Sequence, residues 1–171
     1  LTTISLSDNL TDIYNYSFEY CSNLSSISLP NKVTRILGNA FANSGITSIS
    51  LPNSLTSIGE NAFTSCKKLT SIDIGNGLTS LPNRLFNWCS SLTTLVIPEN
   101  ITSLGEGVCR NCSKLDSITM KYNGVVNWES SSGPFLYNDS LKHIYVPAEY
   151  LSAYKNDSKW SSYGDIFASY N

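Results

Sequence analysis

Residues 46–66, ITSISLPNSLTSIGENAFTSC, contain the pattern that decides the fold of this 171-residue chain. Apolar and small polar residues alternate over residues 49–51, which is the period of a strand with one buried face. Pro52 has no N–H to donate to a strand ladder, so it ends that strand. Leu55 and Ile58 form a second short apolar pair, which predicts a second extended segment.

The second half of this stretch places an aromatic residue and a cysteine three positions apart, at Phe63 and Cys66. Ala62 precedes the aromatic residue, and residues 60–65 are compatible with one turn of α-helix or 3₁₀-helix. We therefore expect short extended or 3₁₀ segments on the side of the unit that lies opposite the strand.

The same pattern recurs along the whole chain with a period of about 23 residues. One unit cannot bury its own apolar face, but stacked units place equivalent residues about 4.8 Å apart and join them into internal columns. A period of this length is typical of leucine-rich repeats. The units begin at Leu1, Leu24, Ile46, Leu69, Leu92, Leu115 and Leu141.

The repeats predict a β-rich α/β fold, namely a right-handed leucine-rich repeat solenoid with one parallel strand per repeat. Residues 1–171 are expected to form a single domain, with an aromatic C-terminal cap over residues 147–171. In that tail Tyr150 and Tyr154 have helical spacing, and the last coil of a solenoid needs an atypical cover. No equivalent cap precedes Leu1, so we expect an open coil edge there and more chain upstream.

The unit Leu-Thr-Ser-Ile-x-Leu-Pro-x-x-Leu-Thr-x-Ile-Gly-x-x-Ala-Phe-x-x-Cys, clearest at residues 46–66, resembles the BspA-type leucine-rich repeat. The resemblance covers essentially the whole chain. It implies a surface-exposed or secreted protein of a host-associated bacterium or a parasitic protist, involved in adhesion to host proteins and to other cells. The family has no catalytic residues to transfer to this sequence.

Composition and charge argue against two classes of partner. Charged residues make up 14% of the chain, its net charge is −2, and its 11 Lys and Arg residues are scattered. A nucleic-acid binder normally carries a basic patch that neutralises phosphates. No apolar run approaches the roughly 20 residues needed to span a bilayer. The sequence therefore predicts neither nucleic-acid binding nor membrane insertion of this segment.

Five cysteines suggest two kinds of chemistry, a metal site and disulfide bonds. Cys109 and Cys112 have the spacing of a zinc half-site, but a tetrahedral site needs two more ligands, and His143 lies about one and a half units away. Stacked cysteines in an oxidising compartment can also approach disulfide distance. Parallel equivalents point the same way, however, and Ser44 occupies one position of the column. We expect buried free thiols, and no metal, cofactor or catalytic site.

Residues 124–134 interrupt the repeat and are expected to form a local loop. Trp128 in this loop has two alternatives: it packs on the convex side, which is favoured because Trp rarely sits fully exposed, or it stands out as a binding residue.

Most outward strand positions carry Ser or Thr, and variety appears only toward the C-terminal end. If the chain binds a protein partner there, we expect the contacts to concentrate at this end and on the 124–134 loop. The candidate partner-binding residues are Asp73, Val96, Asp116, Trp128, Lys142, His143 and Tyr145.

The function that these features favour is a cell-surface or secreted protein-interaction or adhesion module with no catalysis of its own. Its partner would be a surface protein of the host or of a neighbouring cell. The alternative is a structural spacer or targeting array attached to a missing catalytic domain.

Overall fold

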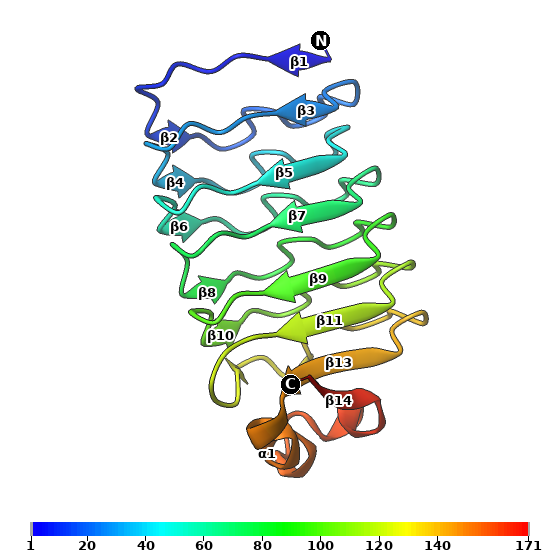
Figure 1. Cartoon of the computed structure of the whole chain (residues 1–171). Coiled ribbons are helices and arrows are strands. Elements are labelled where there is room, and N and C mark those ends of the chain that lie inside the picture. Colours follow the sequence, from blue (N-terminus) through cyan, green and yellow to red (C-terminus); the bar gives the residue numbers. More distant parts are fainter. Residues whose placement is uncertain (1, 171) are drawn as a thin grey trace.

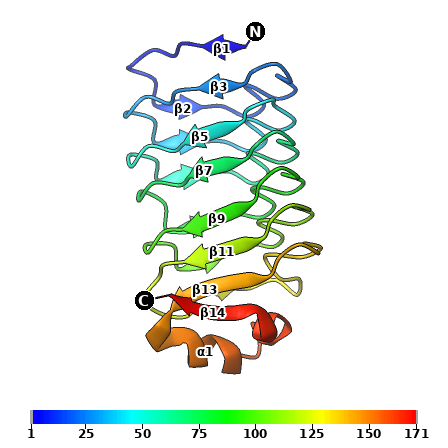
Figure 2. The same cartoon turned by 45° about the vertical axis from the view of Figure 1, so that its right-hand side comes forward.

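The computed structural model describes residues 2–170, which form a β-solenoid of stacked coils. Each coil crosses one side of the solenoid as a strand and then continues along a second side as a shorter strand (Figures 1 and 2). The first sheet face contains β1 (Thr3–Ile4), β3 (Ser26–Ile27), β5 (Ser48–Ser50), β7 (Ser71–Asp73), β9 (Thr94–Ile97), β11 (Ser117–Met120), β13 (His143–Pro147) and β14 (Phe167–Tyr170).

The second sheet face consists of two-residue strands, one in each of six coils. They are β2 (Asp12–Ile13), β4 (Arg35–Ile36), β6 (Ser57–Ile58), β8 (Ser80–Leu81), β10 (Ser103–Leu104) and β12 (Asn127–Trp128). All strand pairs among the described residues are parallel, and those between repeats join equivalent positions, as Ile49 joins Ile72 and Leu95 joins Ile118. The predicted solenoid of parallel strands is therefore confirmed, and so is the second extended segment of each repeat.

Both sheets are interrupted. Within residues 2–170, no ladder joins β3 to β5 or β7 to β9 in the first sheet, and none joins β6 to β8 in the second. Just after β7, Gly75 has a φ of 63° where the preceding coil has Pro52. A Cβ on Gly75 would lie 2.6 Å from the carbonyl oxygen of Leu51, so only glycine lets this chain segment pass.

The third side of the solenoid, here called the turn face, consists of residues 16–20, 39–43, 61–65, 84–88, 107–111 and 133–137. The helical turn expected at residues 60–65 is wrong, because these residues form consecutive hydrogen-bonded turns. Asn61 and Ser65 have φ values of 58° and 57°, in the left-handed region, which no right-handed helix tolerates. The coils remain hydrogen-bonded here, since the N–H of Phe63 donates to the carbonyl of Leu85 at 3.0 Å.

A stack of phenylalanines lies beneath the turn face. The ring centroids of Phe18 and Phe41 are 5.0 Å apart, those of Phe41 and Phe63 5.1 Å, and those of Phe63 and Phe86 5.9 Å. Cys109 takes the next position and ends the stack. The rings fill the core of each coil, and their spacing measures the advance per coil on this side.

A second internal column, as predicted, consists of Cys21, Ser44, Cys66, Cys89 and Cys112. All five cysteines of the chain are free; Cys21 is partly buried and the other four are buried. The thiols of Cys66, Cys89 and Cys112 donate hydrogen bonds of 3.1 to 3.2 Å to the carbonyls of Phe41, Phe63 and Phe86, respectively. Each thiol therefore hydrogen-bonds to a buried carbonyl of the preceding coil. Ser44 occupies the same column, and its hydroxyl lies 3.4 Å from the Cys66 sulfur.

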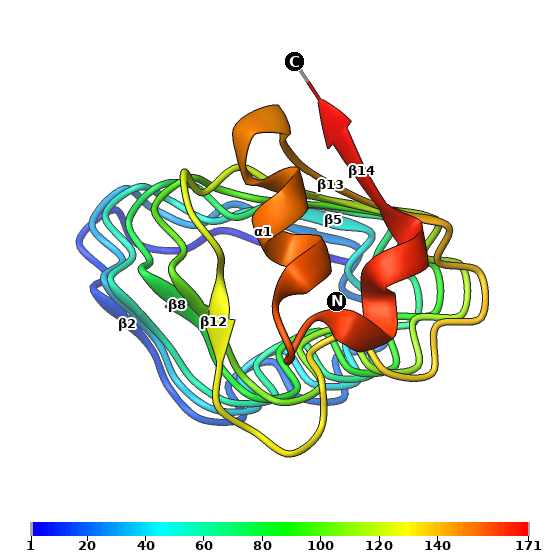
Figure 3. The same cartoon turned by 90° about the horizontal axis from the view of Figure 1, so that it is seen from below.

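The C-terminal tail covers the last coil, as expected of a cap. It contains η1 (Ala148–Tyr150), α1 (Leu151–Asn156) and η2 (Ser161–Ile166), followed by β14, which pairs with β13. Figure 3 shows α1 lying across the open end of the solenoid. The tail contributes four buried aromatic residues to the core, namely Tyr154, Trp160, Tyr163 and Phe167. The added strand β14 is a feature that the sequence did not predict.

The interrupted repeat is more regular than expected. Residues 124–134 contain β12, which continues the second sheet and pairs Trp128 with Leu104. The indole of Trp128 is 8% exposed and packs edge-on against Trp160 with ring centroids 6.0 Å apart. The favoured alternative, packing, is confirmed. The prediction that Trp128 contacts a partner is wrong, because the register of β12 turns its side chain inward.

Two further expectations concern the ends of the chain and membranes. The expectation about Leu1 lies outside the described residues. Among residues 2–170, no helix has the length and apolar character needed to cross a membrane.

Candidate interaction surface

The first sheet face presents alternate side chains outward. On β5, for example, Ser48 and Ser50 are exposed while Ile49 is buried. Figure 2 shows this face with no helix or loop of the described chain in front of it. The face is therefore open to a partner along the length of the solenoid.

A shallow groove runs across this face from β1 to β9. It is formed by three adjoining hollows of about 240, 610 and 450 Å³. The first and second hollows share Ser28, and the second and third share Ile72 and Asp73. Because neighbouring hollows share wall residues, they adjoin one another along the face.

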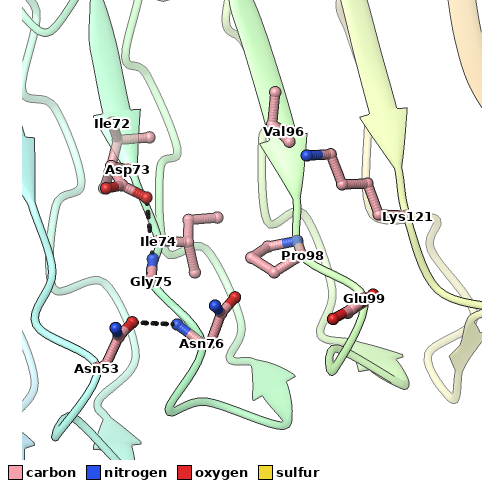
Figure 4. Close-up of a pocket in the computed structure, with 10 residues that line it drawn as sticks. All are labelled: Asn53, Ile72, Asp73, Ile74, Gly75, Asn76, Val96, Pro98, Glu99 and Lys121. Atoms are coloured by element: carbon pink, nitrogen blue, oxygen red, sulfur yellow. Dashed lines mark hydrogen bonds between the residues drawn. The ribbon is translucent and has the colours of Figure 1, made fainter.

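The third hollow lies where no ladder joins β7 to β9, and Figure 4 shows the residues that line it. The carboxylate of Asp73 accepts hydrogen bonds from the Ser50 hydroxyl at 3.0 Å and from the Gly75 N–H at 3.1 Å. Lys121, just after β11, extends toward Val96, and Glu99 lies beyond Pro98 at the lower end. This part of the groove thus offers carboxylates, one ammonium group and an apolar contact.

The structure aligns some of the predicted site residues in one row. Val96 pairs with Thr119, and Thr119 pairs with Tyr145, so these side chains occupy successive strands at the same height. Asp73 holds the equivalent position on β7. Val96 and Tyr145 are therefore two strand spacings apart, or about 10 Å.

The other predicted residues form a charged and aromatic cluster at the C-terminal end of the face. Lys142 binds Asp116 with a nitrogen–oxygen distance of 2.8 Å, and this contact lowers the pKa of the Asp116 carboxyl and raises that of Lys142. The rings of His143 and Tyr145 lie 5.5 Å apart. His143 is exposed, and both side chains of the Asp116–Lys142 pair reach solvent.

Exposed aromatic residues on the opposite side of the coil were missed by the sequence reasoning. Tyr16, Tyr20, Trp88 and Tyr137 belong to the turn face, and Tyr14 lies just before it. The signal was present: Tyr20, Trp88 and Tyr137 each stand two positions after the residue in the aromatic slot of their repeat, where other repeats carry Asn or Ser. An aromatic residue at a position that is polar elsewhere has no role in the core.

The titratable groups inside the coil are not poised for chemistry. Burial raises the pKa of the Cys66 thiol to about 11, and it raises those of Cys89 and Cys109 well above the usual value. Thiolates are the nucleophiles and the metal ligands, so these protonated thiols serve packing. Among residues 2–170, no three side chains of His, Cys, Asp or Glu gather to hold a metal ion.

Comparison with known proteins places the solenoid in a family. Residues 1–49 and 36–157 match six copies of the BspA type leucine rich repeat region, and the chain belongs to this family. No protein of curated function matches the sequence significantly.

Several solved structures share the fold. The T. pallidum leucine-rich repeat protein TpLRR is 21% identical, with a TM-score of 0.68 over 99% of this chain and 85% of that protein. The pneumococcal vaccine antigen PcpA is 19% identical, with a TM-score of 0.64 over 90% of this chain and 44% of its own length. A leucine rich cell surface protein of Faecalibacterium prausnitzii is 19% identical, with a TM-score of 0.52 over all of this chain and 64% of its own length.

These similarities establish the leucine-rich repeat fold. The chain spans 42 to 48% of the length of three of the matching structures, PcpA among them. Membership in a leucine-rich repeat family suggests a protein-interaction module.

Proposed function

We propose that this chain is an extracellular or cell-surface adhesion module that recognises a protein partner on its first sheet face and has no catalysis of its own. The observation that carries the proposal is the series of adjoining hollows across β1–β9, which leads to the Val96–Thr119–Tyr145 row. A surface of this length suits an extended partner segment better than a small molecule, because no part of it encloses a ligand.

The chemistry of the groove supports protein recognition. Serine hydroxyls and asparagine amides along its floor can pair with peptide groups, while Val96, 43% exposed, and the half-buried Tyr145 offer apolar contacts. Tyrosine is enriched among residues that dominate binding energy. Asp73 on one side of the hollow, and Glu99 and Lys121 on the other, give the groove a charge pattern that selects the orientation of a partner.

The surface location rests on the family and on two similar structures, one a vaccine antigen and one a cell surface protein. The absence of catalysis is consistent with the protonated thiols and with an exposed His143 that has no carboxylate partner within hydrogen-bonding distance among the described residues. The alternative is a spacer or targeting array, which would bind nothing through this face.

The proposal is tested by measuring how beads coated with the purified chain bind to epithelial cells, bacterial cells and purified surface proteins. Val96→Asp places a charge in the middle of the row and should weaken the binding found by about tenfold or more. Ser57→Asp is the matched control, because it adds the same charge at an exposed position of β6 on the second sheet face. Equal binding by both variants would contradict the sheet-face site, and no binding by the unmodified chain would favour the spacer.

A further inference from the structure

One position of the turn face has a left-handed backbone in every described coil. It lies two residues after the residue in the aromatic slot and has φ between 56° and 60°. Asparagine, the residue that adopts this conformation most readily after glycine, fills it in two coils, and serine fills it in one. The full column is Tyr20, Asn43, Ser65, Trp88, Asn111 and Tyr137.

The three aromatic residues of this column are not explained by packing. Tyr20 is 71% exposed, Trp88 51% and Tyr137 65%. A bulky side chain is disfavoured in the left-handed region, and such outliers concentrate at functional sites. Large rings held in solvent by a disfavoured backbone conformation therefore indicate a binding role.

Trp88 and Tyr137 are held in register by the backbone. The N–H of Trp88 donates to the carbonyl of Arg110 at 2.8 Å, and the N–H of Asn111 donates to the carbonyl of Leu136 at 3.1 Å. Trp88, Asn111 and Tyr137 thus stand on three successive coils. At one strand spacing per coil the two aromatic side chains are about 10 Å apart, with an amide between them.

Two arginines flank this pair of aromatic residues. The guanidinium of Arg110 lies 4.8 Å from the centroid of the Tyr137 ring. Arg84 is on the same turn face, with its nitrogen 3.8 Å from the carboxylate of Glu106. No ion pair among residues 2–170 involves Arg110, and a guanidinium stacked on a ring keeps its planar edge for a bidentate anion. Two of the three arginines of the chain are in this patch.

We infer that the patch formed by Arg84, Trp88, Arg110 and Tyr137 binds an anionic glycan that carries carboxylate or sulfate groups. The C–H faces of sugar rings stack on the negative faces of aromatic rings. An extended glycan advances by about one strand spacing per sugar, so rings two coils apart contact alternate sugars. Asn111 faces the sugar between them, and Arg110 binds its acidic group.

The geometry favours a glycan over an acidic peptide. The rings stand on an open surface rather than around a socket that would anchor a peptide side chain, and they lie two coils apart along the solenoid. This surface is separate from the groove of the first sheet face, so the inference goes beyond the proposed function. It gives the module a second ligand of a different chemical class.

Tryptophan fluorescence and calorimetry test the inference directly, because Trp88 is the exposed tryptophan while Trp128 and Trp160 are buried. The probes are a sulfated heparin octasaccharide, a neutral chitin hexasaccharide and a polyglutamate peptide of similar length. The octasaccharide should bind, and should shift the fluorescence of the unmodified chain, whereas the other two probes should bind at least about tenfold more weakly.

Variants locate the site on the turn face. Trp88→Asn, Tyr137→Asn and Arg110→Gln should each weaken octasaccharide binding by about tenfold or more. Asparagine already fills the same left-handed position at Asn43 and Asn111, so the asparagine variants keep the backbone, and circular dichroism verifies that they fold. Tyr20→Asn is the matched control, since Tyr20 belongs to the same column without a neighbouring arginine, and it should change binding by less than about twofold.

Several results would overturn the inference. These are no octasaccharide binding, equal binding of the neutral hexasaccharide, stronger binding of polyglutamate, or equal loss in Tyr20→Asn and Trp88→Asn. Val96→Asp on the first sheet face should leave octasaccharide binding unchanged, which separates this site from the proposed protein-binding groove.

Discussion

The hydroxyl oxygen of Tyr154 accepts a hydrogen bond of 2.9 Å from the backbone N–H of Val126. The same residue of the last coil is bound again by the cap, because the indole N–H of Trp160 donates to the Val126 carbonyl at 2.9 Å. In the preceding coil the equivalent carbonyl, that of Thr102, accepts from the N–H of Asn127 in the next coil. Trp160 therefore replaces a hydrogen bond that a further coil would make, while Tyr154 satisfies the Val126 N–H, and both side chains help to cover the apolar core.

Removing the Tyr154 hydroxyl should destabilise the solenoid measurably. Tyr154→Phe keeps the buried ring but leaves the N–H of Val126 without an acceptor, which costs about 1–3 kcal/mol. Urea denaturation followed by circular dichroism measures the change in unfolding free energy. Ser161→Ala removes an exposed hydroxyl bonded to the Ser158 carbonyl and should stay within about 0.5 kcal/mol. Equal stability of Tyr154→Phe and the unmodified chain would refute this role of the hydroxyl.

The buried cysteines should be chemically silent in the folded protein. Four thiols are buried, so at neutral pH only the partly buried Cys21 should react with an aromatic disulfide reagent. In denaturant all five should react. Cys21→Ser should abolish the native-state reaction and leave four thiols in the denatured chain. Fewer than five reactive thiols in the denatured, unmodified chain would show that disulfides form.

Alkaline pH should weaken the fold through the same groups. The pKa of Cys66 is about 11 in the folded state against an ordinary 9.0, and that of Tyr154 is about 12 against 10.0, chiefly because of burial. The folded state therefore holds these protons more tightly than the unfolded state does. Their stabilisation is complete below about pH 9 and is lost as pH rises through 9 to 11 for Cys66 and 10 to 12 for Tyr154.

Urea midpoints measured at about pH 8 and about pH 10.5 check this dependence. The unmodified chain should be less stable at the higher pH. Cys66→Ser removes one of the titrating groups while keeping a donor toward the Phe41 carbonyl, so its midpoint should fall less between the two values. An identical fall in both proteins would exclude Cys66 as a contributor.

The scaffold was predictable because it repeats. The alternation around Ile49, the stop at Pro52 and the columns of Phe63 and Cys66 each recur, so local and stacking preferences agree at every coil. The conformation of the turn face was not predictable, because the Ala62–Phe63 pattern also suits a helix. Only the backbone angles of Asn61 and Ser65 exclude that helix.

The candidate surface was predictable in part for a related reason. Strand alternation is enough to place Val96 and Tyr145 outward in one row. The inward position of Trp128 depends on the register of β12, which begins within an irregular segment and has no sequence signal of its own. Strand β14 likewise forms from residues outside the repeat, so only its pairing with β13 reveals it.

Substitutions at Asn111 test the left-handed column that underlies the glycan-binding inference. Asn111 has a φ of 58°, and its backbone N–H bonds to the Leu136 carbonyl. Asn111→Ala should lower the unfolding free energy by about 1 kcal/mol, because a Cβ without a polar group is disfavoured there. Asn111→Gly should be near neutral, since glycine adopts this conformation freely but gains entropy in the unfolded chain. The midpoints of urea denaturation compare the stabilities of the two variants. Equal stability of both variants would mean that the column is not strained, and Trp88 and Tyr137 would then lose the argument that their backbone conformation serves binding.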